Sequence, residues 1–240
     1  MLADAVNKVA FAIGKDEKFR GDILNNLLIH GKGDYTNFVC SNGYMLAVYK
    51  MDMPFSEKVY IYNEAVETLQ KLLKDATGDI KIGDIRDGVD GKVGFVCLSG
   101  TNFNLAVRVF AEYDYPDYER ISSLGNNWFT MVEVYSKDLE KALNNFKKFD
   151  VVVFELTEGG DGFKVSGTYE GNEVEAWVKG RVVGQDLKVV FKPKQLLEYL
   201  KGVDRYINIK LLSEKEPATF HVANNDSYVY VVIPVLLRTS

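Results

Sequence analysis

The sequence is poor in the residues that metal sites and disulfide frameworks require. It holds only two cysteines and two histidines among 240 residues. Cys40 and Cys97 each lie in an apolar, strand-like run, which predicts buried free thiols in a reducing cytosol. His30 and His221 lie in strand-like runs at turns and lack the spacing of metal ligands. We therefore expect no metal site.

The sequence also lacks the motifs of nucleotide-binding and calcium-binding proteins. Neither G-x-G-x-x-G nor G-K-[S/T] occurs, so no phosphate-binding loop is predicted. KIGDIRDGVDGK (81–92) alternates aspartate with glycine but lacks the acidic twelfth-position ligand of a helix-loop-helix calcium site. A hairpin turn is the better prediction there, and also for GGDG (159–162). These absences predict a non-enzymatic protein that needs no cofactor.

Long hydrophobic runs, a secretory leader and an excess of positive charge are missing as well. No apolar stretch approaches the roughly 20 residues of a membrane span. The first residues carry Asp4 and no basic segment ahead of an apolar one, so we expect a cytoplasmic protein without membrane contact. The net charge of −5 argues against a protein that coats nucleic acid. DNA binding stays open, because affinity depends on where the cations lie.

The chain contains an internal repeat, which sets its architecture. Segments 26–49 and 152–178 both indicate strand, turn, strand, turn, strand. Segments 59–82 and 189–211 each indicate a strand, a short helix with leucines on one face, and another strand. Each half therefore repeats the same order of elements.

Each half also opens with a predicted helix. In the second half this helix begins near Ser136, which can cap its N-terminus, with Asp138 and Glu140 in the first turn. The pattern predicts an α+β protein of two similar domains, each with two helices packed on antiparallel sheets. Segment 122–128 (SSLGNNW) lacks apolar periodicity and marks the boundary. The expected domains are 1–122 and 123–240.

The four predicted helices, 2–13, 64–75, 137–148 and 194–201, combine an apolar stripe with lysines on another face. Solvation alone explains the lysines of any single helix. Four such helices in an acidic chain predict a shared basic surface instead. Lysines on such a surface bind phosphates without regard to sequence, which a protein needs in order to slide along DNA.

Five stretches carry a family resemblance, in this order: FAIGKDEKFRGDILNNLLI (11–29), SNGYMLAVY (41–49), YPDYERI (115–121), FKPKQLLEYLKGVDRYINIKL (191–211) and YVYVVIPVLL (228–237). Together they resemble the second and third domains of bacterial DNA polymerase III beta clamps. The match runs along nearly the whole chain and begins at or just before the first helix. The first strand usual for that domain is therefore short or absent.

The resemblance implies the DNA clamp fold and the function of a sliding clamp, a polymerase processivity factor that encircles duplex DNA. Bacterial clamps have three such domains and close as dimers, whereas two-domain clamps close as trimers. A complete two-domain chain is therefore expected to form a trimeric, head-to-tail homo-oligomeric ring. The implied partners are double-stranded DNA, a DNA polymerase and a clamp loader, in the cytoplasm at the nucleoid.

The resemblance also assigns residues to DNA contacts on the helix faces and the adjoining loop. The expected DNA-binding residues are Lys8, Lys15, Lys18, Arg20, Lys71, Lys74, Lys141, Lys148, Lys194 and Lys201.

A second implied site is an apolar groove between the two domains that takes short peptide motifs with leucine or phenylalanine anchors. Met45 and Leu236 stand where the family usually has arginine, and Lys192 and Gln195 also depart from it. The first half of the groove maps to Leu24, Ser41, Gly43, Tyr44, Met45, Leu46, Pro116, Arg120 and Ile121. The second half maps to Phe149, Lys192, Gln195, Pro217 (weakly aligned), Val231, Val232, Ile233, Pro234, Val235 and Leu236.

Two alternatives stay open at this point. For each apolar groove residue, ordinary packing between domains is the competing interpretation, and for Leu24 and Val231 the two are evenly matched. For the whole chain, the competing function is a clamp-derived peptide-binding module, or a truncated clamp, that binds clamp-binding motifs without forming a ring. Self-association separates a ring from such a module.

Overall fold

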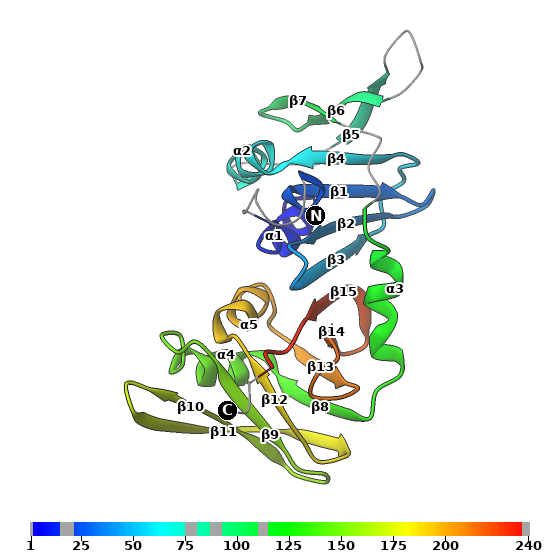
Figure 1. Cartoon of the computed structure of the whole chain (residues 1–240). Coiled ribbons are helices and arrows are strands. Elements are labelled where there is room, and N and C mark those ends of the chain that lie inside the picture. Colours follow the sequence, from blue (N-terminus) through cyan, green and yellow to red (C-terminus); the bar gives the residue numbers. More distant parts are fainter. Residues whose placement is uncertain (1, 15–21, 75–80, 87–92, 110–114, 237–240) are drawn as a thin grey trace. The chain divides into compact units, whose positions relative to one another are not determined.

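The computed structural model describes residues 2–14, 22–74, 81–86, 93–109 and 115–236, with only the backbone of Asp22. The chain folds into two compact units, Met1–Tyr118 (unit 1) and Glu119–Ser240 (unit 2). It passes from one to the other within the short helix α3 (Tyr118–Ser122), shown in green in Figure 1. The expected boundary at residue 122 lies at the end of this helix and stays a prediction.

Unit 1 contains two antiparallel sheets. Strands β4-β1-β2-β3 form one sheet, and β5-β6-β7 form a separate sheet of three strands. Helices α1 and α2 lie side by side against the first sheet (Figure 1). The elements are α1 (Leu2–Ala10), η1 (Asp22–Asn25), β1 (Asn26–Gly31), β2 (Thr36–Ser41), β3 (Met45–Met51), β4 (Lys58–Tyr62), α2 (Asn63–Lys74), β5 (Lys81–Arg86), β6 (Val93–Ser99) and β7 (Asn104–Arg108).

Unit 2 contains one continuous antiparallel sheet in the order β12-β9-β10-β11-β8-β13-β14-β15, against which α4 and α5 pack. The long strand β11 bends from β10 to β8 and so joins the two halves of the sheet. The elements are η2 (Ser123–Asn126), β8 (Thr130–Tyr135), α4 (Ser136–Asn144), β9 (Val152–Leu156), β10 (Gly162–Tyr169), β11 (Asn172–Gly184), β12 (Leu187–Phe191), α5 (Pro193–Leu200), β13 (Tyr206–Leu211), β14 (Ala218–Val222) and β15 (Asn225–Val232).

The helices form where apolar residues recur at helical spacing. In α2, Val66, Leu69 and Leu73 are buried against the sheet, and glutamates occupy the opposite, exposed face. The same arrangement buries Leu139 and Leu143 in α4. The predicted α+β class, with helices on antiparallel sheets, is confirmed.

Two of the helices are shorter than the sequence predicts. Helix α1 ends at Ala10 rather than residue 13, and α4 ends at Asn144 rather than residue 148. In both places the chain continues in tight i→i−3 turns, such as the bond that the Phe146 amide donates to the Leu143 carbonyl at 2.9 Å. The turns keep the apolar side chains buried, so the hydrophobic pattern extends past the helix.

The prediction that Ser136 caps α4 is wrong. Tyr135 occupies the N-cap position, and Ser136 is the first helical residue and fully buried. Its hydroxyl donates to the Val203 carbonyl at 3.0 Å and accepts from the Arg205 amide at 3.2 Å. The serine therefore ties the start of α4 to the loop before β13, a contact that local sequence does not reveal.

Candidate functional site

Most of the predicted DNA-binding lysines that the structure describes are exposed, but Lys8 is not. The Lys8 side chain is only 20% exposed, and its Nζ lies 2.9 Å from the Asp4 carboxylate and 4.6 Å from the centre of the Tyr49 ring. Lys71, Lys74, Lys141 and Lys194 are exposed on their helices. Lys8 is therefore held against unit 1, whereas the other four can reach a ligand in solvent.

Charges on the four long helices balance, and in three of these helices they are sorted along the helix axis. Helices α1, α2, α4 and α5 carry six lysines and six acidic residues in total. In α1, α2 and α4 the acidic residues include one in the first turn and the lysines include one in the last, as the helix dipole favours. The basic character predicted for the helix faces thus belongs to the C-terminal ends of these three helices.

Other predicted cations lie beyond the helix ends. Lys148 is exposed in the turn after α4, next to exposed Lys147. Lys201 follows α5, and its Nζ lies 2.6 Å from the Glu198 carboxylate. Lys147 and Lys148 thus extend the basic end of α4 into the following turn, whereas Lys201 follows a helix whose last turn holds no lysine. Lys15, Lys18 and Arg20 lie outside the described residues.

The first half of the predicted groove is built mostly on the β2–β3 turn of unit 1. Asn42 Oδ1 accepts hydrogen bonds from the Tyr44 and Met45 amides, both at 3.0 Å. Ser41 Oγ donates to the Met45 carbonyl at 2.9 Å and accepts from the amide of Gly43, whose φ is +78°. The turn is thus fixed by its own polar side chains, with Tyr44 55% exposed at the tip.

Leu24 and Leu46 differ from the turn residues because both are buried, at 7% and 4% exposed. Leu24 lies in η1, which packs on β1 and β2. Leu46 starts the pairing of β3 with β2, opposite Ser41. Both side chains are therefore packed within unit 1. A buried leucine is compatible with a place in the groove and with ordinary packing, so the two interpretations of Leu24 stay evenly matched.

The stretch that leads to α3 is anchored on unit 1 by two tyrosines. The Asn37 amide donates to the Tyr118 hydroxyl at 3.0 Å, and His30 Nδ1 lies 2.9 Å from the same oxygen. The buried Tyr115 ring stacks on Tyr60 with centroids 6.1 Å apart, and burial raises the pKa of its hydroxyl. The anchoring leaves the predicted groove residues Pro116 and Arg120 exposed and Ile121 half-buried.

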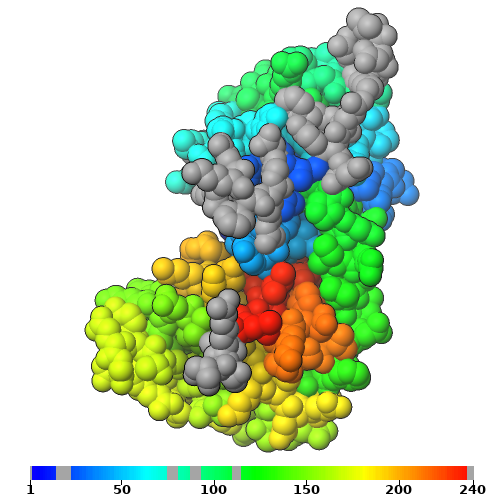
Figure 2. All heavy atoms as spheres, viewed as in Figure 1, coloured from blue at the N-terminus to red at the C-terminus, as the bar shows by residue number. Residues whose placement is uncertain are grey.

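The second half of the predicted groove gathers around the end of β15 in unit 2. Val231 and Val232 are buried, whereas Ile233 and Leu236 beyond them are 43% and 60% exposed. The Val235 amide donates to the Val190 carbonyl of β12 at 2.8 Å, which fixes this tail against the sheet, with Pro234 buried between. In Figure 2 the tail (red) is exposed beside the β13–β14 hairpin (orange).

The start of α5 lies at the same end of the unit 2 sheet as this tail. Lys192 is the exposed N-cap residue of α5. The Tyr230 hydroxyl of β15 donates to the Gln195 carbonyl at 3.2 Å. Phe149 packs between Phe146 and Tyr169, with centroids 5.1 and 5.4 Å away. Unit 2 therefore brings Lys192, Gln195 and the apolar tail together, while Phe149 is held by aromatic packing.

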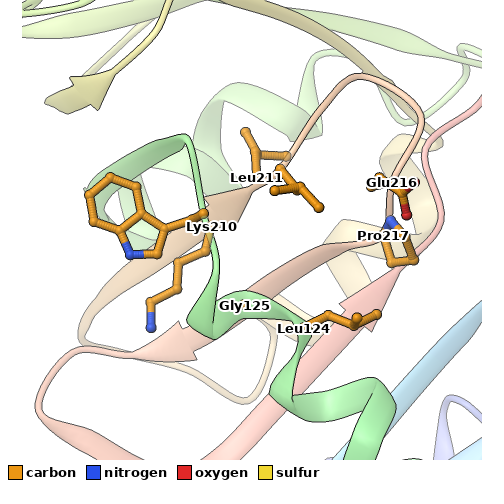
Figure 3. Close-up of a pocket in the computed structure, with 8 residues that line it drawn as sticks. Leu124, Gly125, Lys210, Leu211, Glu216 and Pro217 are labelled. Carbon is orange, nitrogen blue, oxygen red and sulfur yellow. The ribbon is translucent and has the colours of Figure 1, made fainter.

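Pro217 belongs to a small pocket that sequence analysis did not predict (Figure 3). The pocket lies between the η2 stretch and the β13–β14 hairpin, and Leu124 lies beside Pro217 there. Pro217 directly precedes Ala218, which pairs with Val232 at the end of β15, so Pro217 also neighbours the tail that follows Val232. The other lining residues are Gly125, Trp128, Lys210, Leu211, Leu212 and Glu216.

The described residues contain no group of three or more histidine, cysteine or acidic side chains that could hold a metal ion. Cys40 is buried and Cys97 half-buried, and both are free thiols. Across the described part of the chain, the helices are too short or too polar to cross a membrane.

Comparisons of the sequence with protein-family models and with curated protein sequences find no match. Solved structures do match. The sliding clamp of Bacillus subtilis superimposes with a TM-score of 0.86 and 20% identity, over 99% of this chain and 62% of that one. The DNA polymerase III beta subunit of Thermotoga maritima gives a TM-score of 0.84 and 24% identity, over 99% and 64%.

A third match is the putative DNA polymerase III beta subunit of Eubacterium rectale, with a TM-score of 0.85 and 14% identity, over 98% and 63%. The chain therefore spans less than two thirds of the length of these clamps. At such identities the likeness establishes the fold, and the predicted clamp fold is confirmed.

Proposed function

We propose that the protein is a DNA sliding clamp: a non-catalytic subunit that encircles duplex DNA and recruits a polymerase through short peptide motifs. The observation that carries the proposal is the clamp fold, which extends over nearly the whole chain although sequence identity is low. In this function the protein needs no cofactor and no catalytic residue. An ATP-driven loader places it on DNA in the cytoplasm.

The distribution of cations supports contact with phosphates rather than bases. Lys71, Lys74 and Lys141 are exposed near helix C-termini, and Lys147 and Lys148 follow α4. Lysine is a hydrated point charge that attracts phosphate without base readout. The acidic residues on the same helices keep this attraction weak. Weak contacts suit a ring, because a topological link retains DNA without tight binding.

Exposed apolar side chains support the recruitment of peptides. Ile233 and Leu236 are exposed on the tail of unit 2, and Tyr44 is exposed on the β2–β3 turn of unit 1. A short peptide with leucine or phenylalanine anchors would bury such side chains on binding. Because Met45 and Leu236 replace the arginines usual in the family, we propose that the preferred peptides are more apolar than those of other clamps.

The proposal predicts that retention depends on the shape of the DNA. After loading, the protein should leave linear DNA far faster than covalently closed circular DNA of the same sequence, because a ring slides off free ends. Gel filtration of labelled protein with each DNA at moderate salt measures the two loss rates. The contribution of the helix lysines is tested by the variant Lys141→Glu, which reverses a charge on α4. Its matched control is Lys179→Glu, which reverses a charge on strand β11. Only the first should weaken the salt dependence of binding, by about one phosphate contact per chain. Equal loss from both DNA forms would contradict encirclement.

Solution mass separates the ring from the alternative, a peptide-binding module that does not close. A complete two-domain clamp is expected to form a trimer, at three times 27.1 kDa. Light scattering after size exclusion, over a range of protein concentrations, measures this mass. A monomer at every concentration that still binds clamp-binding peptides would favour the module.

A further inference from the structure

The short helix η2 lies directly on strand β14 of unit 2. The two elements contact each other, and Gly125 of η2 is buried at the point of contact. A methyl group added to the Cα atom of Gly125 would overlap the Thr219 hydroxyl and lie 3.1 Å from Nε2 of His221. Because glycine has no side chain, the backbone of η2 can approach both residues. Any larger residue at position 125 would push η2 away from β14.

The surface of β14 beneath η2 is polar, but its polar groups are unpaired. Thr219 and His221 are two residues apart, so both side chains lie on the same face of the strand. Thr219 is fully buried and His221 is 9% exposed. Among the described residues, neither the Thr219 hydroxyl nor either ring nitrogen of His221 has a hydrogen-bond partner, and the same holds for Oδ1 of Asn208, opposite His221 on β13. An unpaired buried group is costly when neutral and far more costly when charged.

The charges around His221 disfavour its protonated form. Burial, and then the repulsion of Lys210 on β13, lower the pKa of His221 from 6.5 to about 4, and the attraction of Asp226 at the start of β15 only partly opposes this shift. Glu133 of β8 is separated from His221 by the neutral side chain of Asn208. Helix η2 (SLGN) contributes no ionisable side chain. The position beneath η2 therefore suits a neutral imidazole and not an imidazolium.

Packing, rather than hydrogen bonding, holds η2 on β14. Its N-cap residue, Ser122, makes no side-chain capping bond, and the Ser122 and Ser123 hydroxyls donate to carbonyls of α3. In the described part of unit 2, no hydrogen bond joins η2 to β14. Beyond η2, the Phe129 amide donates to the Leu211 carbonyl at 2.9 Å, which ties the chain to β13. Loss of the contact at Gly125 is therefore sufficient to free η2 while the sheet stays paired.

We propose that Gly125, Thr219 and His221 form a latch that holds η2 on β14 while His221 is neutral and opens when His221 binds a proton. Opening exposes the imidazolium to water, so its pKa returns toward the ordinary value of 6.5. The closed latch is therefore favoured above pH 6.5, and the opening constant (the ratio of open to closed molecules) rises as the pH falls toward about 4. Thr219 also lies opposite Val231, a predicted groove residue, so the latch borders that part of the predicted peptide site. The latch concerns unit 2 alone and does not depend on the proposed function.

Hydrogen exchange of the full chain measures the opening. The amide of Asn127, which donates to the Leu124 carbonyl at 3.3 Å, reports η2, and the amides of Ile207 and Ile209 report β13. After correction for intrinsic exchange rates, Asn127 should exchange faster than the two β13 amides, because it needs only local opening. Its opening constant should rise by about 20-fold from about pH 7 to about pH 5, since proton binding to the open state adds roughly tenfold for each pH unit well below 6.5.

The matched variant is His221→Gln, which stays neutral at both pH values. Its opening constant at Asn127 should not change between them. His30→Gln alters the other histidine, in unit 1, and should keep the wild-type rise. A parallel rise in the wild type and in His221→Gln would overturn the proposal. Exchange at Asn127 as slow as in β13 would also overturn it, since η2 would then open only when the sheet unfolds.

A second variant tests the contact without any titration. Gly125→Ala should raise the opening constant at Asn127 by at least about tenfold at neutral pH, because the added methyl group overlaps the Thr219 hydroxyl. Adding Thr219→Ala removes that hydroxyl and should restore most of the wild-type protection. If Gly125→Ala exchanges like the wild type, this contact does not hold η2 and the proposal fails. None of these results bears on retention by circular DNA, so the two proposals fail separately.

Discussion

Replacing Phe220 with alanine is expected to lower the free energy of unfolding of unit 2 by about 3–5 kcal/mol. Phe220 is fully buried on β14. Its ring lies 5.6 to 6.1 Å, centroid to centroid, from those of Phe191, Tyr199 and Tyr230. The substitution removes the buried apolar area of the ring. It also leaves a cavity that the three neighbouring aromatic residues, on β12, α5 and β15, cannot easily fill.

Tryptophan fluorescence makes this measurement specific to one unit. The only two tryptophans, Trp128 and Trp177, both belong to unit 2, so urea unfolding followed by their emission reports this unit. The control is Phe129→Ala, a phenylalanine of the same unit that is 57% exposed. This variant should change the unfolding free energy by about 0.5 kcal/mol or less. A loss below about 1 kcal/mol for Phe220→Ala would contradict close packing of the aromatic cluster.

The effect of Phe220 extends to the predicted peptide site. Tyr199 and Tyr230 stack at 4.9 Å, and the Tyr230 hydroxyl holds the Gln195 carbonyl at the start of α5. The cluster therefore positions the part of unit 2 where Gln195 and the apolar tail meet. Loss of Phe220 should loosen that part before the rest of the unit.

Local pattern was sufficient to predict the fold class and most elements. Strands β1–β3 and β9–β11 follow alternating or continuous apolar runs between Gly-rich turns, and α2 follows leucines at helical spacing. These signals depend on neighbours in sequence, which is why they predict elements well. The repeat of the pattern then pointed to two similar halves.

Contacts between distant segments could not be predicted in this way. Nothing near Ser136 reveals that its hydroxyl bonds Val203, and nothing near Tyr118 reveals His30 and Asn37 as partners. The pocket beside Leu124 likewise depends on a hairpin far along the chain. The charges of the helices are visible in the sequence, but a basic helix face does not follow from lysines alone, because acidic residues of equal number lie on the same helices.

Acidification is expected to destabilise unit 2 through His221. This histidine is 9% exposed on β14, and neither ring nitrogen has a hydrogen-bond partner among the described residues. Burial, and then the nearby charge of Lys210, lower its pKa from 6.5 to about 4, while Asp226 opposes the shift. Between these two pH values, His221 therefore binds a proton in the unfolded chain but stays neutral in folded unit 2. Stability from this group is present above pH 6.5 and is lost as the pH falls toward about 4.

The full loss is on the order of 3 kcal/mol, from the free-energy equivalent of a pKa shift of this size. Unfolding by urea, followed by tryptophan emission at pH values from 7 to about 4, measures it. Because carboxylates also titrate in this range, the quantity to compare is the difference between the wild-type protein and His221→Gln, which stays neutral. The variant should lose less stability on acidification. His30→Gln alters the other histidine, in unit 1, and should keep the wild-type dependence in this assay. If His221→Gln and the wild type lose stability in parallel, the buried imidazole is not the group that titrates.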